Sequence, residues 1–186
     1  MAKRKRVVAI VGMAGSGKSE VSQAFVARGY TRIRFGDVTD EEVKRRGLAL
    51  NEANERTVRE ALRREHGMAA YAKLNLPRIT AALEKGSVVL DGLYSWEEYL
   101  LLKEHYRDSL VLVAVCTAPR TRYSRLGRRR ERPLNTEAAL SRDRAEIENV
   151  NKGGPIAMAD FTIINESTLT DLRDWAGRII SEMGQR

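Results

Sequence analysis

The residues with the clearest chemical pattern lie near the start of the chain: Gly12-Met13-Ala14-Gly15-Ser16-Gly17-Lys18-Ser19. They match G-x-x-x-x-G-K-[ST], the pattern of a loop that binds nucleotide phosphates. Glycines let such a loop point its backbone N–H groups inward, where they and the positive end of the following helix attract phosphate oxygens. In this interpretation Lys18 contacts the β- and γ-phosphates, and the Ser19 hydroxyl binds Mg²⁺. The expected nucleotide-binding residues of this segment are Gly12, Ala14, Gly15, Ser16, Gly17, Lys18, Ser19 and Glu20.

The glycine spacing argues against a dinucleotide-binding loop. That loop has the pattern G-x-G-x-x-G, whereas the glycines here follow G-x-x-G-x-G and would leave Lys18 and Ser19 unexplained. Asp37 nevertheless stands about where a ribose-binding acid would lie in such a protein. The other alternative is a chance glycine-rich turn, which the expected strand before the loop and helix after it disfavour.

Short apolar runs alternate with longer amphipathic stretches along the chain. The runs are rich in Val and Ile, which is typical of parallel strands buried on both faces. The five expected strands are Val7–Val11, Thr31–Phe35, Ser87–Asp91, Leu110–Cys116 and Phe161–Asn165. Helices are expected from near Gly17, from Thr39, over about 54–66 and 68–85, from Ser95, and over about 119–130, 137–150 and 169–183; Thr39-x-x-Glu42 and Ser95-x-x-Glu98 have the capping-box pattern. This alternation predicts a three-layer α/β fold with a parallel sheet.

An aspartate ends the third expected strand. Asp91 is expected to hold the Mg²⁺ shell together with Ser19; the alternative is a strand-end residue that caps the next turn. The next residue is Gly92, which has no side chain to orient a hydrolytic water. This favours phosphoryl transfer to a bound acceptor over hydrolysis.

Seven arginines gather after the fourth expected strand. Guanidinium groups that close over a nucleotide can stabilise the charge that spreads over the oxygens during phosphoryl transfer, and they exclude water. Arg125 and Arg129 are expected in this role; the alternatives are a solvated basic face or an RNA-contacting surface. The seven are Arg120, Arg122, Arg125, Arg128, Arg129, Arg130 and Arg132.

In this order, the motifs make the sequence resemble the P-loop nucleotide and nucleoside kinases, most closely the dephospho-CoA-kinase-like and adenylate-kinase-related proteins. The resemblance covers nearly the whole chain. It is carried by Gly12–Ser19, Phe35-Gly36-Asp37, Asp91-Gly92, the Arg125–Arg132 region and Ala159–Asn165. It implies a P-loop NTPase fold with sheet order 2-3-1-4-5 and the cofactors ATP and Mg²⁺. It also implies that Asp37 lies beside the acceptor, where a carboxylate orients a hydroxyl or accepts its proton, and that Asn165 lies near the adenine.

The resemblance further implies one kinase domain over residues 1–186. Its core is 1–36, 86–119 and 153–186, with an acceptor-binding helical insert over 37–85 and an Arg-rich lid over 120–152. Three positions depart from the family. Asp40 stands where adenylate kinases have Arg, Leu93-Tyr94-Ser95 replaces their Phe-Pro-Arg, and Val38-Thr39 replaces the second aspartate of dephospho-CoA kinases. Dephospho-CoA and a nucleoside monophosphate therefore both stay open as the acceptor.

The amino-acid composition limits the possible partners, metal sites and location of the protein. The 33 Lys and Arg against 25 Asp and Glu give a net charge of +8, which suits nucleotide phosphates and also nucleic acid. The alternative function is therefore a nucleotide-dependent RNA-binding or regulatory protein without a small acceptor, which we do not favour. The single Cys116 excludes an internal disulfide and a Cys-based zinc site. The apolar runs are too short to span a membrane, so we expect a cytoplasmic monomer or small homo-oligomer.

Overall fold

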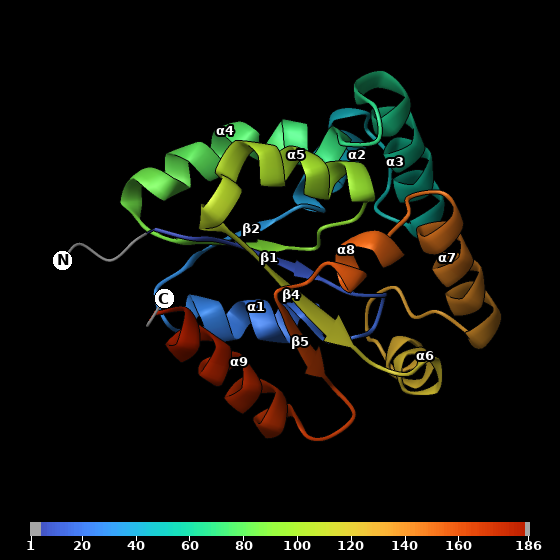
Figure 1. Cartoon of the computed structure of the whole chain (residues 1–186). Coiled ribbons are helices and arrows are strands. Elements are labelled where there is room, and N and C mark those ends of the chain that lie inside the picture. Colours follow the sequence, from blue (N-terminus) through green and yellow to red (C-terminus); the bar gives the residue numbers. More distant parts are fainter. Residues whose placement is uncertain (1–4, 185–186) are drawn as a thin grey trace.

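A five-stranded sheet in the order β2-β3-β1-β4-β5 organises the computed structural model, which describes residues 5–184 (Figure 1). All neighbouring strands are parallel. The predicted three-layer P-loop NTPase fold and its strand order are thereby confirmed, and each strand end lies within one residue of the expected position. The strands are β1 (Val7–Val11), β2 (Thr31–Arg34), β3 (Val88–Asp91), β4 (Leu110–Cys116) and β5 (Phe161–Ile164).

The central strand β1 contributes side chains to two separate hydrophobic cores, one on each face of the sheet. Its odd-numbered residues pack in the core beneath α4 and α5, and its even-numbered residues pack against α1 and α9 on the other face. Figure 1 shows these two helical layers on opposite sides of the sheet. Because both faces of β1 are covered, its apolar run is continuous rather than alternating. The four helices are α1 (Lys18–Val26), α4 (Ala70–Lys85), α5 (Trp96–Tyr106) and α9 (Leu169–Met183).

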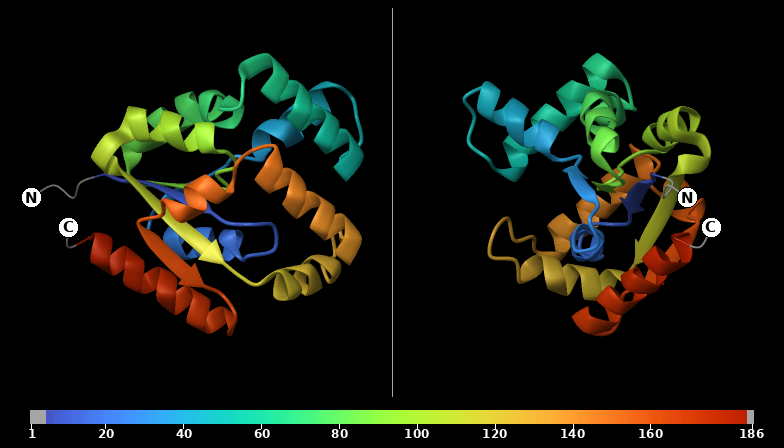
Figure 2. Two further views of the ribbon diagram at one scale, coloured as in Figure 1. Left: turned by 45° about the vertical axis from the view of Figure 1, so that its right-hand side comes forward. Right: turned by 90° about the vertical axis from the view of Figure 1, so that its left-hand side faces the viewer.

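Two helical excursions leave the sheet after β2 and β4. The first contains α2 (Asp37–Arg45) and α3 (Glu52–His66) before α4 returns to the sheet. The second contains α6 (Pro119–Gly127), α7 (Thr136–Glu148) and α8 (Gly153–Ala157), while a short 3-10 turn, Arg107–Ser109, precedes β4. Figures 1 and 2 show α3 and α7 side by side beyond the carboxyl ends of the strands. In open parallel sheets, ligands bind at this edge.

One of the two predicted capping boxes is confirmed and the other is wrong. Ser95 caps α5: its hydroxyl accepts from the Glu98 N–H at 3.1 Å, and the Glu98 carboxylate accepts from the Ser95 N–H. Helix α2 instead begins at Asp37, directly after β2, so that Thr39 lies inside the helix. The Thr39 hydroxyl forms a buried hydrogen bond of 2.6 Å with the Tyr71 hydroxyl. A tertiary partner therefore replaces the local cap.

The predicted helix over about 119–130 is shorter than expected. Helix α6 ends at Gly127, and Arg132 adopts a left-handed backbone with φ of 52°. The chain then folds back, so that the Leu134 N–H donates to the Leu126 carbonyl at 3.3 Å. The arginines from Arg128 to Arg132 consequently lie on a loop and not on a helix. The short helix α8 was not expected from the sequence.

Helix α9 is amphipathic rather than uniformly apolar. In α9, the buried residues recur every three or four positions, as expected for one face of a surface helix. Within residues 5–184, we find no helix with the length and apolar character needed to cross a lipid bilayer.

A buried ion pair joins the two lid helices. Arg122 of α6 is 3% exposed and donates to both carboxylate oxygens of Asp143 in α7, at 2.9 and 2.6 Å. The Tyr123 hydroxyl donates to the same carboxylate at 2.9 Å. Such a pair fixes helix orientation, because leaving either charge alone in the interior is costly.

We predict that Asp143→Ala lowers the free energy of unfolding by roughly 3 kcal/mol, because it leaves the buried Arg122 guanidinium without its counterion. Denaturant unfolding followed by circular dichroism measures this loss. Asp174→Ala, at an exposed position of α9, is the matched control and should change stability by less than about 0.5 kcal/mol. Equal stability of the two variants would contradict the assignment.

Candidate functional site

The phosphate loop approaches three other segments too closely for side chains at its glycines. Gly12, Gly15 and Gly17 all have positive φ, at 151°, 79° and 102°. An added Cβ would lie 2.4 Å from the Val115 carbonyl oxygen at Gly12 and 2.9 Å from the Arg122 carbonyl oxygen at Gly15. The glycines are therefore required by backbone conformation and by packing together.

Lys18 begins α1 and folds back over the loop. Its ammonium group donates to the carbonyls of Gly12 and Met13 at 2.8 and 2.9 Å. Burial and the nearby Lys152 lower the pKa of Lys18 to about 7. The buried Ser16 hydroxyl has no hydrogen-bond partner among the described residues. A cation and an unpaired hydroxyl in a glycine cradle fit the phosphates of a nucleotide.

Polar side chains from two other segments fix the carbonyls of the loop. The Asn165 amide donates to the Ser16 carbonyl at 2.7 Å, and the Thr117 hydroxyl donates to the same oxygen at 3.0 Å. Arg122 donates to the Ala14 carbonyl at 3.1 Å. The structure thus places Asn165 under the phosphate loop, and its expected contact with adenine stays a prediction.

The two expected Mg²⁺ ligands lie on neighbouring elements. Ser19 is exposed in the first turn of α1, and Asp91 ends β3 opposite Ile10 of β1. Arg32 of β2 pairs with Asp91, its Nε lying 3.1 Å from Oδ2. Residues 5–184 contain no group of three or more acidic, His or Cys side chains placed so that they could hold one metal ion. This set fits Mg²⁺, which needs only one or two protein ligands beside phosphates and water.

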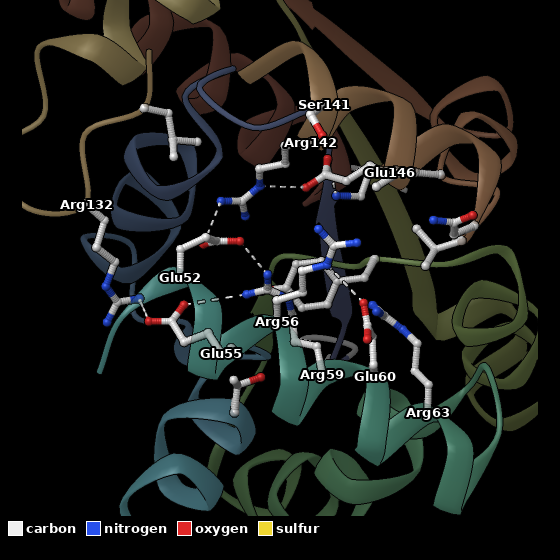
Figure 3. Close-up of a pocket in the computed structure, with 18 of the residues that line it drawn as sticks. Glu52, Glu55, Arg56, Arg59, Glu60, Arg63, Arg132, Ser141, Arg142 and Glu146 are labelled. Atoms are coloured by element: carbon white, nitrogen blue, oxygen red, sulfur yellow. Dashed lines mark hydrogen bonds and ion pairs between the residues drawn. The ribbon is translucent and has the colours of Figure 1, made fainter. Parts of the chain in front are cut away.

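A cavity of about 710 Å³ opens between the insert and the lid (Figure 3). Side chains of α3 face side chains of α7 across it. Its walls are strongly charged, with seven arginines and Lys152 against five carboxylates. These charged residues are Arg34, Arg56, Arg59, Arg63, Arg129, Arg132, Arg142 and Lys152, and Asp40, Glu52, Glu55, Glu60 and Glu146.

Ion pairs bridge the cavity from lid to insert. Arg132 of the lid loop lies 2.7 Å from the Glu55 carboxylate of α3, and Arg142 of α7 lies 3.8 Å from Glu52. Glu55 is 5% exposed, and burial raises its pKa above the usual range. The loop after α6 and helix α7 are therefore connected to α3 by charged contacts.

Related sequences from one protein family align with almost the whole length of this chain. A UPF0200 protein of Thermococcus kodakarensis is 35% identical over 182 residues, covering 95% of this chain and 97% of that protein. A UPF0200 protein of Methanococcus maripaludis is 33% identical over 172 residues, covering 89% and 91%. This chain belongs to the UPF0200 family. Residues 8–149 also match the family described as an AAA domain.

Solved structures of kinases share the fold of this UPF0200 protein. A gluconokinase from Sinorhizobium meliloti aligns with a TM-score of 0.62 at 16% identity, covering 98% of this chain and 96% of that one. A dephospho-CoA kinase from Campylobacter jejuni aligns with a TM-score of 0.56 at 14% identity, covering 98% and 99%. At such identities the comparison establishes a kinase-like P-loop fold, and the chemistry must be argued from the site.

Some of the expected site residues line the cavity and others do not. Arg129 reaches the cavity, whereas the Arg125 guanidinium donates to the Asn165 carbonyl at 3.2 Å, beside the phosphate loop. Arg34 holds Asp37 at 2.8 Å and Asp40 at 2.9 Å, and Asp40 rather than Asp37 lines the cavity. Glu20 forms a long exposed contact of 3.4 Å with Arg173. The catalytic role of Asp37 stays a prediction.

Most of the charged residues of the cavity escaped sequence analysis, including three that pair with one another. Arg142, Glu146 and Lys152 line the cavity, and the Glu146 carboxylate pairs with Arg142 Nε at 3.2 Å and with Lys152 Nζ at 2.7 Å. The four-residue spacing of Arg142 and Glu146 on an expected helix was a usable signal for their pairing. Lys152 carried no such signal, because its burial depends on the turn before α8.

We predict that MgATP binding takes up a proton above pH 7. In the empty site Lys18 has a pKa of about 7, and phosphate oxygens would raise it by favouring the ammonium form. Affinity should therefore be constant below pH 7 and fall by up to roughly tenfold per pH unit above it. Calorimetry at pH 8 in buffers of different ionisation enthalpy measures the uptake. Lys18→Met should abolish it, and Lys103→Met on exposed α5 should not.

Proposed function

We propose that this protein is an ATP-dependent kinase that transfers the γ-phosphoryl group to a nucleotide-type acceptor bound between α3 and α7. The closeness of the phosphate loop to the charged cavity supports this proposal. Lys18 of the phosphate loop interacts electrostatically with Glu146 and Lys152, which line the cationic cavity. A donor site and a second anion-binding site therefore meet at the carboxyl edge of the sheet, where ligands of this fold bind.

The donor half of the site consists of the loop amides, Lys18, Ser19 and Asp91. When bound, MgATP would supply the phosphoryl group and a cation that neutralises charge on the phosphates. The loop amides and Lys18 bind the donor phosphates, and Ser19 and Asp91 hold the metal shell. Arg129 lies at the cavity, where its guanidinium can screen the transferred group and exclude water. Asp37 is held by Arg34 and does not line the cavity, so its expected role in orienting the acceptor stays a prediction.

The charge of the cavity favours an acceptor that already carries a phosphate. Arg63 lines the cavity, and its guanidinium lies 5.4 Å from the centre of the Tyr71 ring without a carboxylate partner among the ion pairs of residues 5–184. A guanidinium in a pocket is suited to an anionic oxygen of a ligand. A nucleoside monophosphate and dephospho-CoA both have such an anion together with a free hydroxyl or phosphate oxygen as nucleophile.

Phosphoryl transfer can be tested directly with γ-labelled ATP and a panel containing dephospho-CoA, nucleoside monophosphates and nucleosides. We expect label in one acceptor, and we expect Lys18→Ala to reduce its rate by at least 100-fold while the protein stays folded. Lys103→Ala, an exposed lysine of α5, is the control and should keep the wild-type rate. Transfer undiminished in Lys18→Ala would refute the proposal. Salt-sensitive RNA binding without any transfer would instead favour the RNA-binding alternative.

Arg63 provides a test of the acceptor half alone. We predict that Arg63→Gln raises the KM for the acceptor at least tenfold and leaves the Kd for MgATP unchanged, because this guanidinium lies in the cavity and not at the phosphate loop. Arg64→Gln is the matched control, since Arg64 is its exposed neighbour on α3. Steady-state kinetics and calorimetry separate the two constants. A parallel loss of MgATP affinity would show that Arg63 has been assigned to the wrong half.

A further inference from the structure

Lys152 is a fully buried lysine in the turn between α7 and α8. It is 1% exposed, and its Nζ lies 2.7 Å from the Glu146 carboxylate and 5.1 Å from the centre of the Tyr94 ring. The turn is fixed by the Lys152 N–H, which donates to the Glu146 carbonyl at 3.1 Å, and by Asn151 with φ of 51°. Burying a charged pair is seldom favourable for stability compared with apolar packing. The position therefore calls for a functional reason.

The Glu146 carboxylate is shared among several cations. It contacts Lys152 and also Arg142, whose Nε lies 3.2 Å away. These cations and Lys18 hold the pKa of Glu146 at about 2 despite its burial. Glu146 is thus a permanent anion in the centre of three positive groups.

Three other acids lie near this group. Asp91 pairs with Arg32. Glu98 accepts the Tyr94 and Ser95 N–H groups at the start of α5, and burial raises its pKa to about 7. Glu52 of α3 lies 3.8 Å from Arg142. Two carboxylates, Glu146 and Glu52, therefore face the three basic side chains of the group, and an anionic ligand can neutralise the difference.

The location of these charged side chains, between the phosphate loop and the cavity, indicates which ligand would neutralise their charge. Lys152, Glu146 and Arg142 line the cavity, and Figure 3 shows Arg142 and Glu146 directed into it from α7. On the other side the group interacts electrostatically with Lys18 of the phosphate loop. The group consequently lies where the terminal phosphate of a donor nucleotide would meet the acceptor.

We infer that Lys152 is a second phosphate-binding lysine, which contacts the γ-phosphate of the bound nucleotide. Before the nucleotide binds, Glu146 is the counterion of Lys152. On binding, the γ-phosphate oxygens take over the contacts that the Glu146 carboxylate makes with Lys152 and Arg142. This inference rests on the proposed kinase function, because it assumes a nucleoside triphosphate in the phosphate loop.

The test compares the affinities of MgATP and MgADP by calorimetry, with no acceptor and no turnover. Lys152→Met should weaken MgATP at least tenfold and MgADP less than threefold. Glu146→Gln removes the competing carboxylate and should tighten MgATP by about threefold or more, with MgADP unchanged. The two single variants break the same ion pair, so a purely structural role would change both affinities in the same direction.

The double variant Lys152→Met/Glu146→Gln leaves no buried charge of the pair unmatched and is the one best able to fold. It should lose MgATP affinity as Lys152→Met does. Equal losses for MgATP and MgADP, or weaker MgATP binding in Glu146→Gln, would overturn the role of Lys152 while leaving the proposed kinase function intact. Wild-type protein that binds neither nucleotide would overturn both.

Discussion

The phosphate loop depends on contacts from outside its own sequence. Its carbonyls at Ala14 and Ser16 are bound by Arg122, Thr117 and Asn165, which belong to the ends of β4 and β5 and to α6. A further bond lies within the loop, where the Ser16 N–H donates to the Met13 carbonyl at 3.2 Å, so that the loop backbone is held in place. Little reorganisation is then needed on binding, which is the condition under which backbone dipoles stabilise an anion most effectively.

The same contacts connect the loop to the lid. Arg122 binds the loop carbonyl and also the Asp143 carboxylate of α7, so that one buried guanidinium positions both elements. Helix α7 in turn carries Arg142 and Glu146 into the cavity. The position of the phosphate loop, the direction of α7 and the shape of the cavity are therefore coupled through a single buried ion pair and its neighbours.

Charge governs the second half of the site. Arg132 and Arg142 reach carboxylates of α3 across the cavity, and such partly exposed pairs are individually weak. An anionic ligand can therefore replace these carboxylates at little cost. The kinase-like fold is shared with enzymes that act on a sugar acid and on dephospho-CoA. Under the proposed kinase function, the acceptor is accordingly determined by the cavity residues and not by the fold.

The sequence alone determined the strands and the phosphate loop, because these follow from local patterns: continuous apolar runs, glycines at fixed spacing and a following Lys-Ser. The strand order followed only from the resemblance to the P-loop kinases, because no local pattern states which strands are neighbours. The sequence also placed the Ser95 cap correctly, since that cap is made within four residues. The tertiary structure alone decided that Thr39 bonds Tyr71 instead of capping α2, that α6 ends at Gly127, and that Lys152 is buried against Glu146. These features depend on partners supplied by packing between distant elements, and no local pattern of residue types records which buried charge or hydroxyl will be available there.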